Sequence, residues 1–317
     1  MHRLDKLSKL WGGEIWIKRD DLTESGLSGN KVRKLEYLIS DAQSADADTL
    51  ISCGGIQSNH CRATALVAAR FGMNCRLLLR GDQPSELDGN LLFNHLAGAE
   101  IEYIDTESYH GNLQHHLDLM AKKAINAGFK PYIISEGGSN AIGAWGYRDA
   151  ISEVKVQCDD FKVKPNRIVC ATGSGGTHAG LWLGSRLDNW AVEVVSIAVC
   201  YSAKETVIRI KKIIDEAIDR FKLDIECDPS DIIVMDGYIG DGYAIADDDV
   251  YGTMSEVARS EGLLVDPVYT GKAIRAVKQE VKAGRFSGST LFWHTGGVYG
   301  IFPFRQELGL LLTGLDE

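Results

Sequence analysis

Short, almost continuously apolar segments recur along this chain, and each is followed by a Gly-rich turn and then by a helical pattern. IVC (168–170) and VVSIAV (194–199) are two of them. Successive side chains of a strand point to opposite faces, so segments of this kind need cover on both faces. The pattern predicts an α/β fold with open, mostly parallel sheets flanked by helices.

The expected elements alternate along most of the chain. Helical periodicity covers 30–42, 57–71, 112–128 and 202–221, among others. The segments expected to be strands are 14–20, 49–55, 75–80, 99–104, 131–135, 167–173, 192–199, 231–236 and 290–297. Ligands of open α/β sheets bind at the carboxyl ends of strands, so the turns after these segments are where a site is expected.

Composition excludes several classes of function. The 317 residues carry a formal net charge of −10, which disfavours nucleic acid and anionic membranes as partners. No apolar run approaches the length of a membrane span, and the N-terminus lacks the apolar core of a signal peptide, so a cytoplasmic location is expected.

Cysteine spacing points to free thiols rather than to disulfides or a metal site. The seven cysteines form an odd set without a C-x-x-C pair, which fits a reducing compartment and gives no zinc spacing. Cys170 and Cys200 end apolar runs and are expected to be core residues. His178, His115 and His116 are given no catalytic role, and no metal is predicted.

The first candidate corner is SGNK, residues 28–31. Gly29 permits a tight turn, and Asn30 is expected to cap the helix that Lys31 begins. The positive end of a helix disfavours an ammonium group, so the pKa of Lys31 is expected to fall toward neutrality. A neutral amine is what Schiff-base chemistry requires, although most lysines are simply solvated.

The second corner is CGGIQSNH, residues 53–60, where a strand ends and a helix begins near Ser58 and Asn59. Consecutive N–H groups at such a start can bind a carboxylate, although the same residues also fit an ordinary N-cap without a ligand.

The third corner is ATGSGGTHAG, residues 171–180, an apolar strand followed by small residues and a helix. It matches neither a Walker A loop nor G-x-G-x-x-G, and favours binding of a single phosphate.

One phosphate, one activated lysine and one carboxylate site together describe pyridoxal 5′-phosphate (PLP) holding an amino acid. The stretches that carry a family resemblance are RDDLTESGLSGNKVRKLEYLISDA, ISCGGIQSNHCRATA, EGGSNAIGAWGY, TGSGGTHAGL, LLVDPVYTGKA and LFWHTGGVYGIF. They resemble the D-cysteine desulfhydrase and 1-aminocyclopropane-1-carboxylate deaminase family, closest to the desulfhydrases. That family has the two-domain, tryptophan-synthase-β-like architecture of fold type II PLP enzymes.

The resemblance implies roles for particular residues of this sequence. Lys31 is then the Schiff-base lysine and general base, and Ser58 lies beside the substrate near its Cα–Cβ bond. Asn59 is expected to bond the ring hydroxyl of the cofactor, and the backbone of Ser58, Asn59 and His60 to take the substrate carboxylate. Tyr243 and Tyr269 match active-site tyrosines, although buried tyrosines often only satisfy core hydrogen bonds. The phosphate-binding residues implied are Gly173, Ser174, Gly175, Gly176 and Thr177.

Thr270 is the position at which this sequence differs informatively from the deaminases of the family. The deaminases carry Glu at this place, against the pyridine nitrogen, where a carboxylate keeps that nitrogen protonated and the electron sink strong. Thr270 leaves the sink weaker, which favours β-elimination of a good leaving group over opening of a cyclopropane ring. The expected reaction is elimination from D-cysteine to pyruvate, ammonia and hydrogen sulfide.

Alternatives remain open on the sequence alone. They are an L-cysteate sulfo-lyase or another lyase of β-substituted alanines such as 3-chloro-D-alanine, a ring-opening deaminase, and a non-catalytic PLP-binding protein. By resemblance, residues 1–34 and 139–317 form a large PLP-binding domain and 35–138 a small one, in a homodimer. Arg33 and Lys34 are expected to face acids elsewhere. His294 and Thr295 are expected to close the far side of the cofactor, in a packing or supporting role only.

Overall fold

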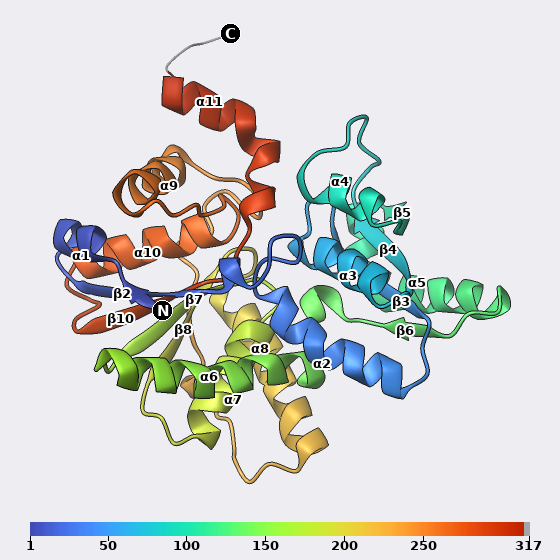
Figure 1. The fold of residues 1–317 in the computed structure, drawn as a ribbon, viewed down its shortest axis with the longest axis horizontal. Coiled ribbons are helices and arrows are strands. Elements are labelled where there is room, and N and C mark those ends of the chain that lie inside the picture. The colour runs from blue at the N-terminus through green and yellow to red at the C-terminus, as the bar shows by residue number, and fades with distance from the viewer. Residues whose placement is uncertain (314–317) are drawn as a thin grey trace.

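The computed structural model describes residues 1–313, and its larger sheet has six strands in the order β1-β2-β10-β7-β8-β9. Their bounds are β1 (His2–Arg3), β2 (Glu14–Arg19), β7 (Arg167–Thr172), β8 (Glu193–Ala198), β9 (Ile233–Met235) and β10 (Ser289–His294). Only β1 runs antiparallel to its neighbour; the other pairings are parallel. The larger sheet occupies the left of Figure 1.

The smaller sheet, at the right of Figure 1, has four parallel strands in the order β5-β4-β3-β6. Its strands are β3 (Thr49–Gly55), β4 (Asn74–Arg80), β5 (Glu100–Ile104) and β6 (Pro131–Ile133). All four come from residues 49–133, while β1 and β2 precede them and the rest of the larger sheet follows. The chain therefore starts in one sheet, builds the other, and returns.

Helices flank both sheets. They are α1 (Asp5–Trp11), α2 (Lys31–Ser44), α3 (Asn59–Arg70), α4 (Gly89–Leu96), α5 (Thr106–Asn126), α6 (Ala141–Phe161), α7 (Gly176–Leu187), α8 (Ala203–Phe221), α9 (Asp248–Glu261), α10 (Thr270–Lys282) and α11 (Arg305–Thr313). Helix α2 joins the two halves: its Leu35, Leu38 and Ile39 pack in the core of the smaller sheet, and its other neighbour is α6. No helix among residues 1–313 has the length and apolar character needed to cross a bilayer.

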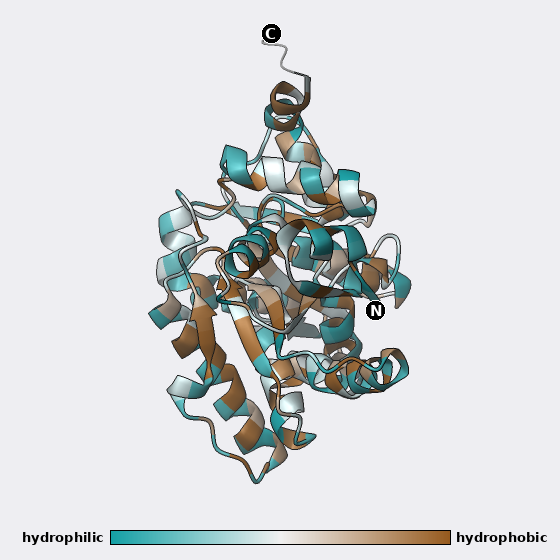
Figure 2. Ribbon diagram, turned by 90° about the vertical axis from the view of Figure 1, so that its left-hand side faces the viewer, coloured by the Kyte–Doolittle hydropathy of each residue, from teal (hydrophilic) through white to brown (hydrophobic). Residues whose placement is uncertain are grey.

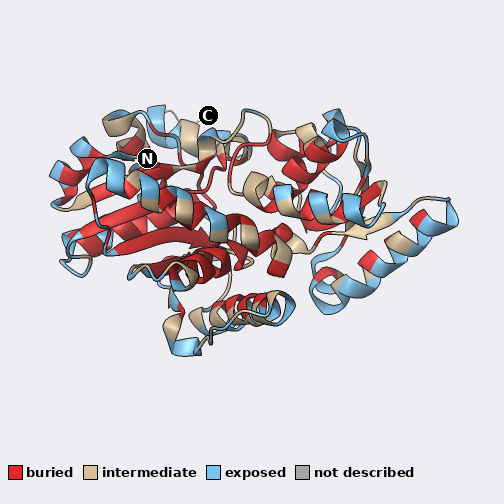
Figure 3. Ribbon diagram, turned by 60° about the horizontal axis from the view of Figure 1, so that its bottom comes forward, coloured by how far each residue is buried: buried red, intermediate tan, exposed pale blue. Residues whose placement is uncertain are grey.

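Burial explains why the central strands are apolar on both faces. Every residue of β7 and β10 is buried, and Figure 3 shows the strands of the larger sheet enclosed between helices. Hydrophobic residues run along these strands, whereas the outer helices carry hydrophilic residues (Figure 2). The α/β class with mostly parallel sheets, predicted from continuous apolar runs, is confirmed.

Element boundaries differ from expectation in a few places. The strand at 49–55 matches its prediction, but β9 and β6 are shorter than their apolar runs, and the edge strand β1 was not predicted. The helix expected at 112–128 begins at Thr106, where Asp105 caps it, and bends at Asn112. Strand β1 has only two residues, which is too short for a periodic pattern to be detected in the sequence.

Candidate active site

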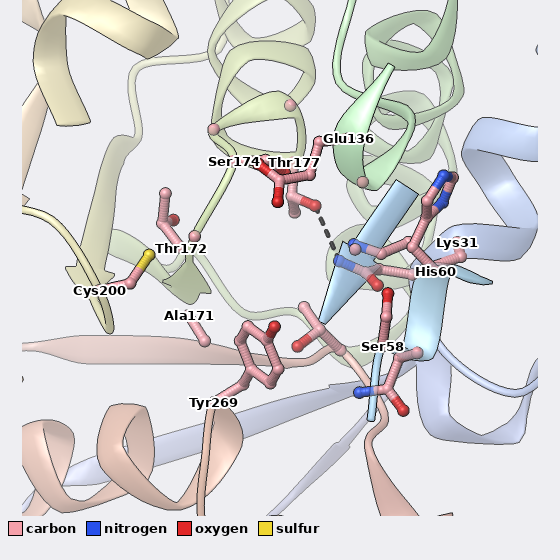
Figure 4. Close-up of a pocket in the computed structure, with 18 of the residues that line it drawn as sticks. Lys31, Ser58, His60, Glu136, Ala171, Thr172, Ser174, Thr177, Cys200 and Tyr269 are labelled. Atoms are coloured by element: carbon pink, nitrogen blue, oxygen red, sulfur yellow. Dashed lines mark hydrogen bonds between the residues drawn. The ribbon is translucent and has the colours of Figure 1, made fainter. Parts of the chain in front are cut away.

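The three candidate corners border a single cavity between the two sheets. Figure 4 shows Lys31 and Ser58 on the side of the smaller sheet, with Ser174 and Thr177 above and Tyr269 below. The cavity is lined by Asn30, Lys31, Lys34, Gly54, Gly55, Ser58, Asn59, His60, Arg80, His110, Glu136, Gly137, Ala171, Thr172, Gly173, Ser174, Gly175, Gly176, Thr177, Cys200, Tyr201, Tyr243, Tyr269, Thr295 and Gly296. Strand ends far apart in the sequence thus meet, as parallel sheets require.

Lys31 is the first residue of α2 and faces the cavity. The pKa of Lys31 is lowered to about 8, chiefly by burial of its amine; the Glu136 charge opposes this shift, and the Arg62 charge adds to it. The direction agrees with expectation, but the leading cause is loss of solvation rather than the position at a helix start. A substantial fraction of the Lys31 amine is therefore neutral near pH 8.

The other two cations of this helix turn have different partners. Arg33 donates to both oxygens of Asp20, at 3.0 and 2.9 Å, and to Glu153 at 2.8 Å, as expected of a residue facing acids. The same expectation is wrong for Lys34. Its Nζ donates to the Gly137 carbonyl at 3.2 Å and to Ser139 Oγ at 3.1 Å, and burial lowers the pKa of Lys34 well below its usual value.

Lys34 instead meets the glycine turn at the start of α7. A Cβ on Gly176 would lie 2.5 Å from Ser139 Oγ and 2.9 Å from Lys34 Nζ, so any side chain here would displace these two groups. Ser139 Oγ accepts from the Gly176 N–H at 3.2 Å and also bonds Ser174 Oγ at 2.7 Å. Backbone donors at a helix start, two hydroxyls and a buried lysine without a carboxylate form a cradle suited to a phosphate.

Asn30 does not cap α2 as expected. Its backbone is helical, and its side-chain NH₂ crosses to Thr177 Oγ1 at 3.0 Å, the dashed contact in Figure 4. A capping residue needs extended backbone to turn its side chain back on the helix, which Asn30 lacks. This bond ties the Lys31 turn to the glycine turn of α7.

The second corner is arranged as predicted, with Ser58 as the N-cap of α3. Ser58 Oγ accepts from the Cys61 N–H at 3.2 Å. The Asn59 side-chain oxygen accepts from Asn90 at 3.1 Å and Arg62 at 3.2 Å, so its own N–H donors are unused by these contacts. His60 is buried, and its Nε2 bonds Ser52 Oγ at 2.8 Å.

The two predicted tyrosines come together at the cavity. The hydroxyls of Tyr243 and Tyr269 lie 2.6 Å apart, and both residues line the cavity. Burial raises the pKa of Tyr243 to about 12 and that of Tyr269 well above its usual value. Both hydroxyls therefore keep their protons at neutral pH and can donate one.

Thr270 lies behind the cavity wall rather than in it. Its hydroxyl donates to Asp266 Oδ1 at 2.6 Å, and the side chain is fully buried. The Asp266 carboxyl also accepts from the Val268, Tyr269 and Thr270 N–H groups. Among the residues expected at the site, Thr270 is the exception that does not line the cavity. The resemblance placed this residue against the pyridine nitrogen of PLP, and that placement stays a prediction.

Several residues outside the expected set line the cavity. Cys200, expected in the core, packs partly buried against it, but it also follows the end of β8 and lines the cavity, and burial raises its thiol pKa to about 12. Arg80 ends β4, and Glu136 follows β6 in the same way. Cys200, Arg80 and Glu136 all lie at or just after the end of a strand, and this position could have predicted that they line the site. Lys34 could have been found from its i,i+3 spacing to Lys31, which places both on one helix face.

The histidines and cysteines outside the cavity behave as expected. His178 is fully buried and bonds Ser196 Oγ at 2.8 Å, and His294 bonds the Leu264 carbonyl at 2.9 Å. All seven cysteines are free, and Cys170 lies in the core. Thr295 lines the cavity, as expected of a residue that closes one side of it, and its carbonyl accepts from the Asn30 N–H at 3.0 Å.

Comparison with known proteins identifies the kind of site. Residues 1–296 match the family model described as "Pyridoxal-phosphate dependent enzyme". The chain is 41% identical over 96% of its length to a putative 1-aminocyclopropane-1-carboxylate deaminase of Thermotoga maritima, and covers 95% of that protein. It is 37% identical over 96% of its length to the D-cysteine desulfhydrase of Klebsiella pneumoniae, covering 93% of that protein.

The chain belongs to the PLP-dependent enzymes, in the 1-aminocyclopropane-1-carboxylate deaminase/D-cysteine desulfhydrase family. A solved structure described as an "ACC deaminase homologue" superposes with a TM-score of 0.89 at 36% identity, over 98% of this chain and 92% of that one. The resemblance to this family and its fold type II architecture, predicted from the sequence, are confirmed.

The side chains of this PLP-dependent enzyme fit the cofactor. The cradle of Gly176, Ser139 and Lys34 suits a phosphate, and Lys31 supplies a partly neutral amine on the adjoining turn. Asn59 has an unused donor for an oxygen on the ring. Lys34 is buried without a carboxylate, which is costly unless an anion accompanies it.

Proposed function

We propose that the protein catalyses β-elimination on D-cysteine, giving pyruvate, ammonia and hydrogen sulfide. The observation that carries this proposal is the Tyr243–Tyr269 hydroxyl pair, facing the cavity that Lys31 and Ser58 line from the other side. Elimination needs a base at Cα and support for the group that leaves Cβ. The cavity offers an amine for the first task and two protonated phenols for the second.

The residues divide the work as follows. Bound PLP supplies an electron sink for the bonds at the substrate Cα. The Lys34 cradle, residues 173–177 and Ser139 hold the phosphate, and Asn59 bonds the ring oxygen. The N–H groups at the start of α3 take the substrate carboxylate, which the positive end of that helix favours. Lys31 removes the Cα proton, and Tyr269 gives a proton to the departing sulfur.

A second candidate is opening of a cyclopropane ring, which the similarity to the Thermotoga maritima protein favours. Against it stands Thr270, where the resemblance places Glu in the deaminases. Asp266 accepts the Thr270 hydroxyl and does not line the cavity, so we expect a weaker electron sink than a carboxylate in direct contact would give.

Product analysis tests the choice. The PLP-loaded protein is given D-cysteine, L-cysteine, L-cysteate, 3-chloro-D-alanine and 1-aminocyclopropane-1-carboxylate, and pyruvate, sulfide, sulfite and 2-oxobutanoate are measured. Sulfide with pyruvate from D-cysteine is expected. Sulfite without sulfide, or 2-oxobutanoate as the main product, would reject the proposal. A Lys31→Ala variant should lose all turnover, which separates enzymatic from free-PLP chemistry.

The leaving-group role of Tyr269 has its own test. Tyr269→Phe removes one hydroxyl and keeps the ring, and kcat for D-cysteine should fall about 100-fold because the sulfur loses its proton donor. Chloride leaves without a proton, so turnover of 3-chloro-D-alanine should fall much less. Equal losses with both substrates would contradict a role at the leaving group.

A further inference from the structure

Arg80 is a cavity residue to which neither the cofactor nor the substrate carboxylate gives a role. It is the last residue of β4 and pairs in register with Gly55 at the end of β3. Its guanidinium lies over the rings of Tyr109, at 5.3 Å, and Tyr243, at 5.5 Å. Its Nη1 is 3.1 Å from His110 Nε2.

The guanidinium is left open on the side of Gly55. A Cβ at Gly55 would lie 3.7 Å from Arg80 Nη2, so a longer side chain there would cover the group. The neighbouring Gly54 would place a Cβ 2.6 Å from Ser58 Oγ. Arg80 Nη2 therefore lies beside the strand end that leads into the substrate corner.

No carboxylate within residues 1–313 forms an ion pair with Arg80. The acid of the cavity, Glu136, accepts the Tyr109 hydroxyl at 2.7 Å. A guanidinium has several N–H donors in one plane, and His110 engages one of its nitrogens. Arg80 thus presents an unpaired charge and free donors to an anion in the cavity.

The remaining donors already have anions assigned to them. Lys34 and the start of α7 suit the phosphate, and the start of α3 suits the substrate carboxylate. Arg80 comes from the end of β4 and lies against Tyr243, whose hydroxyl is 2.6 Å from that of Tyr269. A cation beside the proton donors of the leaving group is suited to negative charge at Cβ.

We propose that Arg80 binds the substituent on the substrate Cβ and selects alanines whose substituent is anionic, a thiolate or a sulfonate, over neutral ones. This inference rests on the proposed β-elimination. As the Cα–H bond breaks toward Lys31, its electron pair forms the Cα–Cβ double bond. The Cβ–S electron pair leaves with sulfur: a thiolate takes a proton from Tyr269 as the bond breaks and departs as hydrosulfide, whereas a sulfonate departs as sulfite without a proton. Arg80 contacts that sulfur group before and while it leaves.

Kinetics of Arg80→Gln and Arg80→Lys test the role. For D-cysteine and cysteate, kcat/KM should fall about tenfold or more in Arg80→Gln, the loss of roughly one charged contact, and recover partly in Arg80→Lys. For 3-chloro-D-alanine, whose substituent is neutral, the change should stay within about threefold. Arg76→Gln is the matched control, since Arg76 lies on the same strand but pairs with Glu100 outside the cavity.

The pattern of losses decides between roles. An equal fall for all three substrates in Arg80→Gln would mean that Arg80 holds the carboxylate or the fold, and would overturn the proposal. No fall for any of them would overturn it as well. A larger effect on cysteate than on D-cysteine would assign the sulfonate as the preferred anion, and the reverse would assign the thiolate.

Equilibrium binding separates this inference from the proposed function. The affinity of the PLP-loaded protein for 3-sulfopropanoate and for butanoate is measured by calorimetry, so no turnover is needed. The wild type should prefer the sulfonate, and Arg80→Gln should lose that preference while still binding butanoate. If no substrate yields pyruvate but this preference is present and Arg80-dependent, the elimination is wrong and the anion site stands. A wild type without the preference would overturn the anion site itself.

Discussion

Lys31 and Lys34 lie one helical turn apart, and the same physical cause acts on both amines. Burial lowers the pKa of Lys31 to about 8 and that of Lys34 well below its usual value. Lys31 borders the cavity, and its lowered pKa leaves part of its amine neutral and therefore nucleophilic. Lys34 donates only to neutral oxygens, from Gly137 and Ser139, so a bound phosphate would be the anion that favours its charged form.

The pH dependence of cofactor capture follows from the Lys31 pKa. The neutral amine reacts with the aldehyde of PLP, so in the apoprotein the rate of attachment should rise with pH through a midpoint near 8. Glu136 favours the ammonium form, so Glu136→Gln should move the midpoint to lower pH. Stopped-flow absorbance after mixing apoprotein with PLP measures this. A midpoint near that of an exposed lysine would show that the amine is not buried.

At the scale of elements, the starts of α2, α3 and α7 converge on the cavity, and glycines allow the approach. Gly175 has a φ of +94°, which lets the chain turn from β7 into α7, and Gly176 leaves room for Ser139 and Lys34. Three helix starts at one place sum their partial positive charges there. That arrangement favours a ligand with a phosphate and a carboxylate.

A single methyl group should close the phosphate cradle. Gly176→Ala would place a Cβ 2.5 Å from Ser139 Oγ, so we expect PLP affinity to fall about tenfold or more with little change in secondary structure. Fluorescence titration with PLP measures the affinity, and circular dichroism the fold. Gly252→Ala is the control, since Gly252 lies within α9 with nothing within 4 Å of its Cβ position. Unchanged affinity in Gly176→Ala would place the phosphate elsewhere.

At the scale of the whole molecule, the cavity joins the two sheets through side chains of both. Asn30 bonds Thr177, and Arg62, on α3, donates to the Ser28 carbonyl at 2.7 Å and to Asn90 at 2.8 Å. A ligand bound at this junction stabilises the folded state as a whole, by about 2.7 kcal/mol at a hundredfold excess over its Kd.

Lys34→Met should therefore raise the stability of the apoprotein and reduce the stability that PLP adds. The apoprotein should gain about 1 kcal/mol or more, because a buried amine that recaptures a proton on unfolding is replaced by an apolar side chain. The added stability from PLP should shrink, because the phosphate loses its counter-charge. Thermal denaturation of apo and loaded protein measures both. An undiminished gain from PLP would contradict the assignment of Lys34 to the phosphate.

Much of this molecule follows from local pattern. Continuous apolar runs determined which segments are strands and that the sheets are mostly parallel, since a strand buried on both faces leaves that mark in sequence. The turns after the strands at 49–55 and 167–173 supplied the corners of the site. Ser58 at the start of α3 also follows from local capping preferences.

The tertiary structure alone decided which residues share the cavity and what charge they face. Asn30 bonds Thr177, 147 residues away, instead of its own helix, and Arg80 has no acidic partner in the described chain. Cys200 lines the cavity although the apolar segment it ends predicts a core residue. Thr270 donates its hydroxyl to Asp266 and does not line the cavity. Solvation and pairing depend on groups that arrive from distant segments. The sequence therefore determined the elements and their order, whereas folding determined the pKa of Lys31 and the cation left for the substrate.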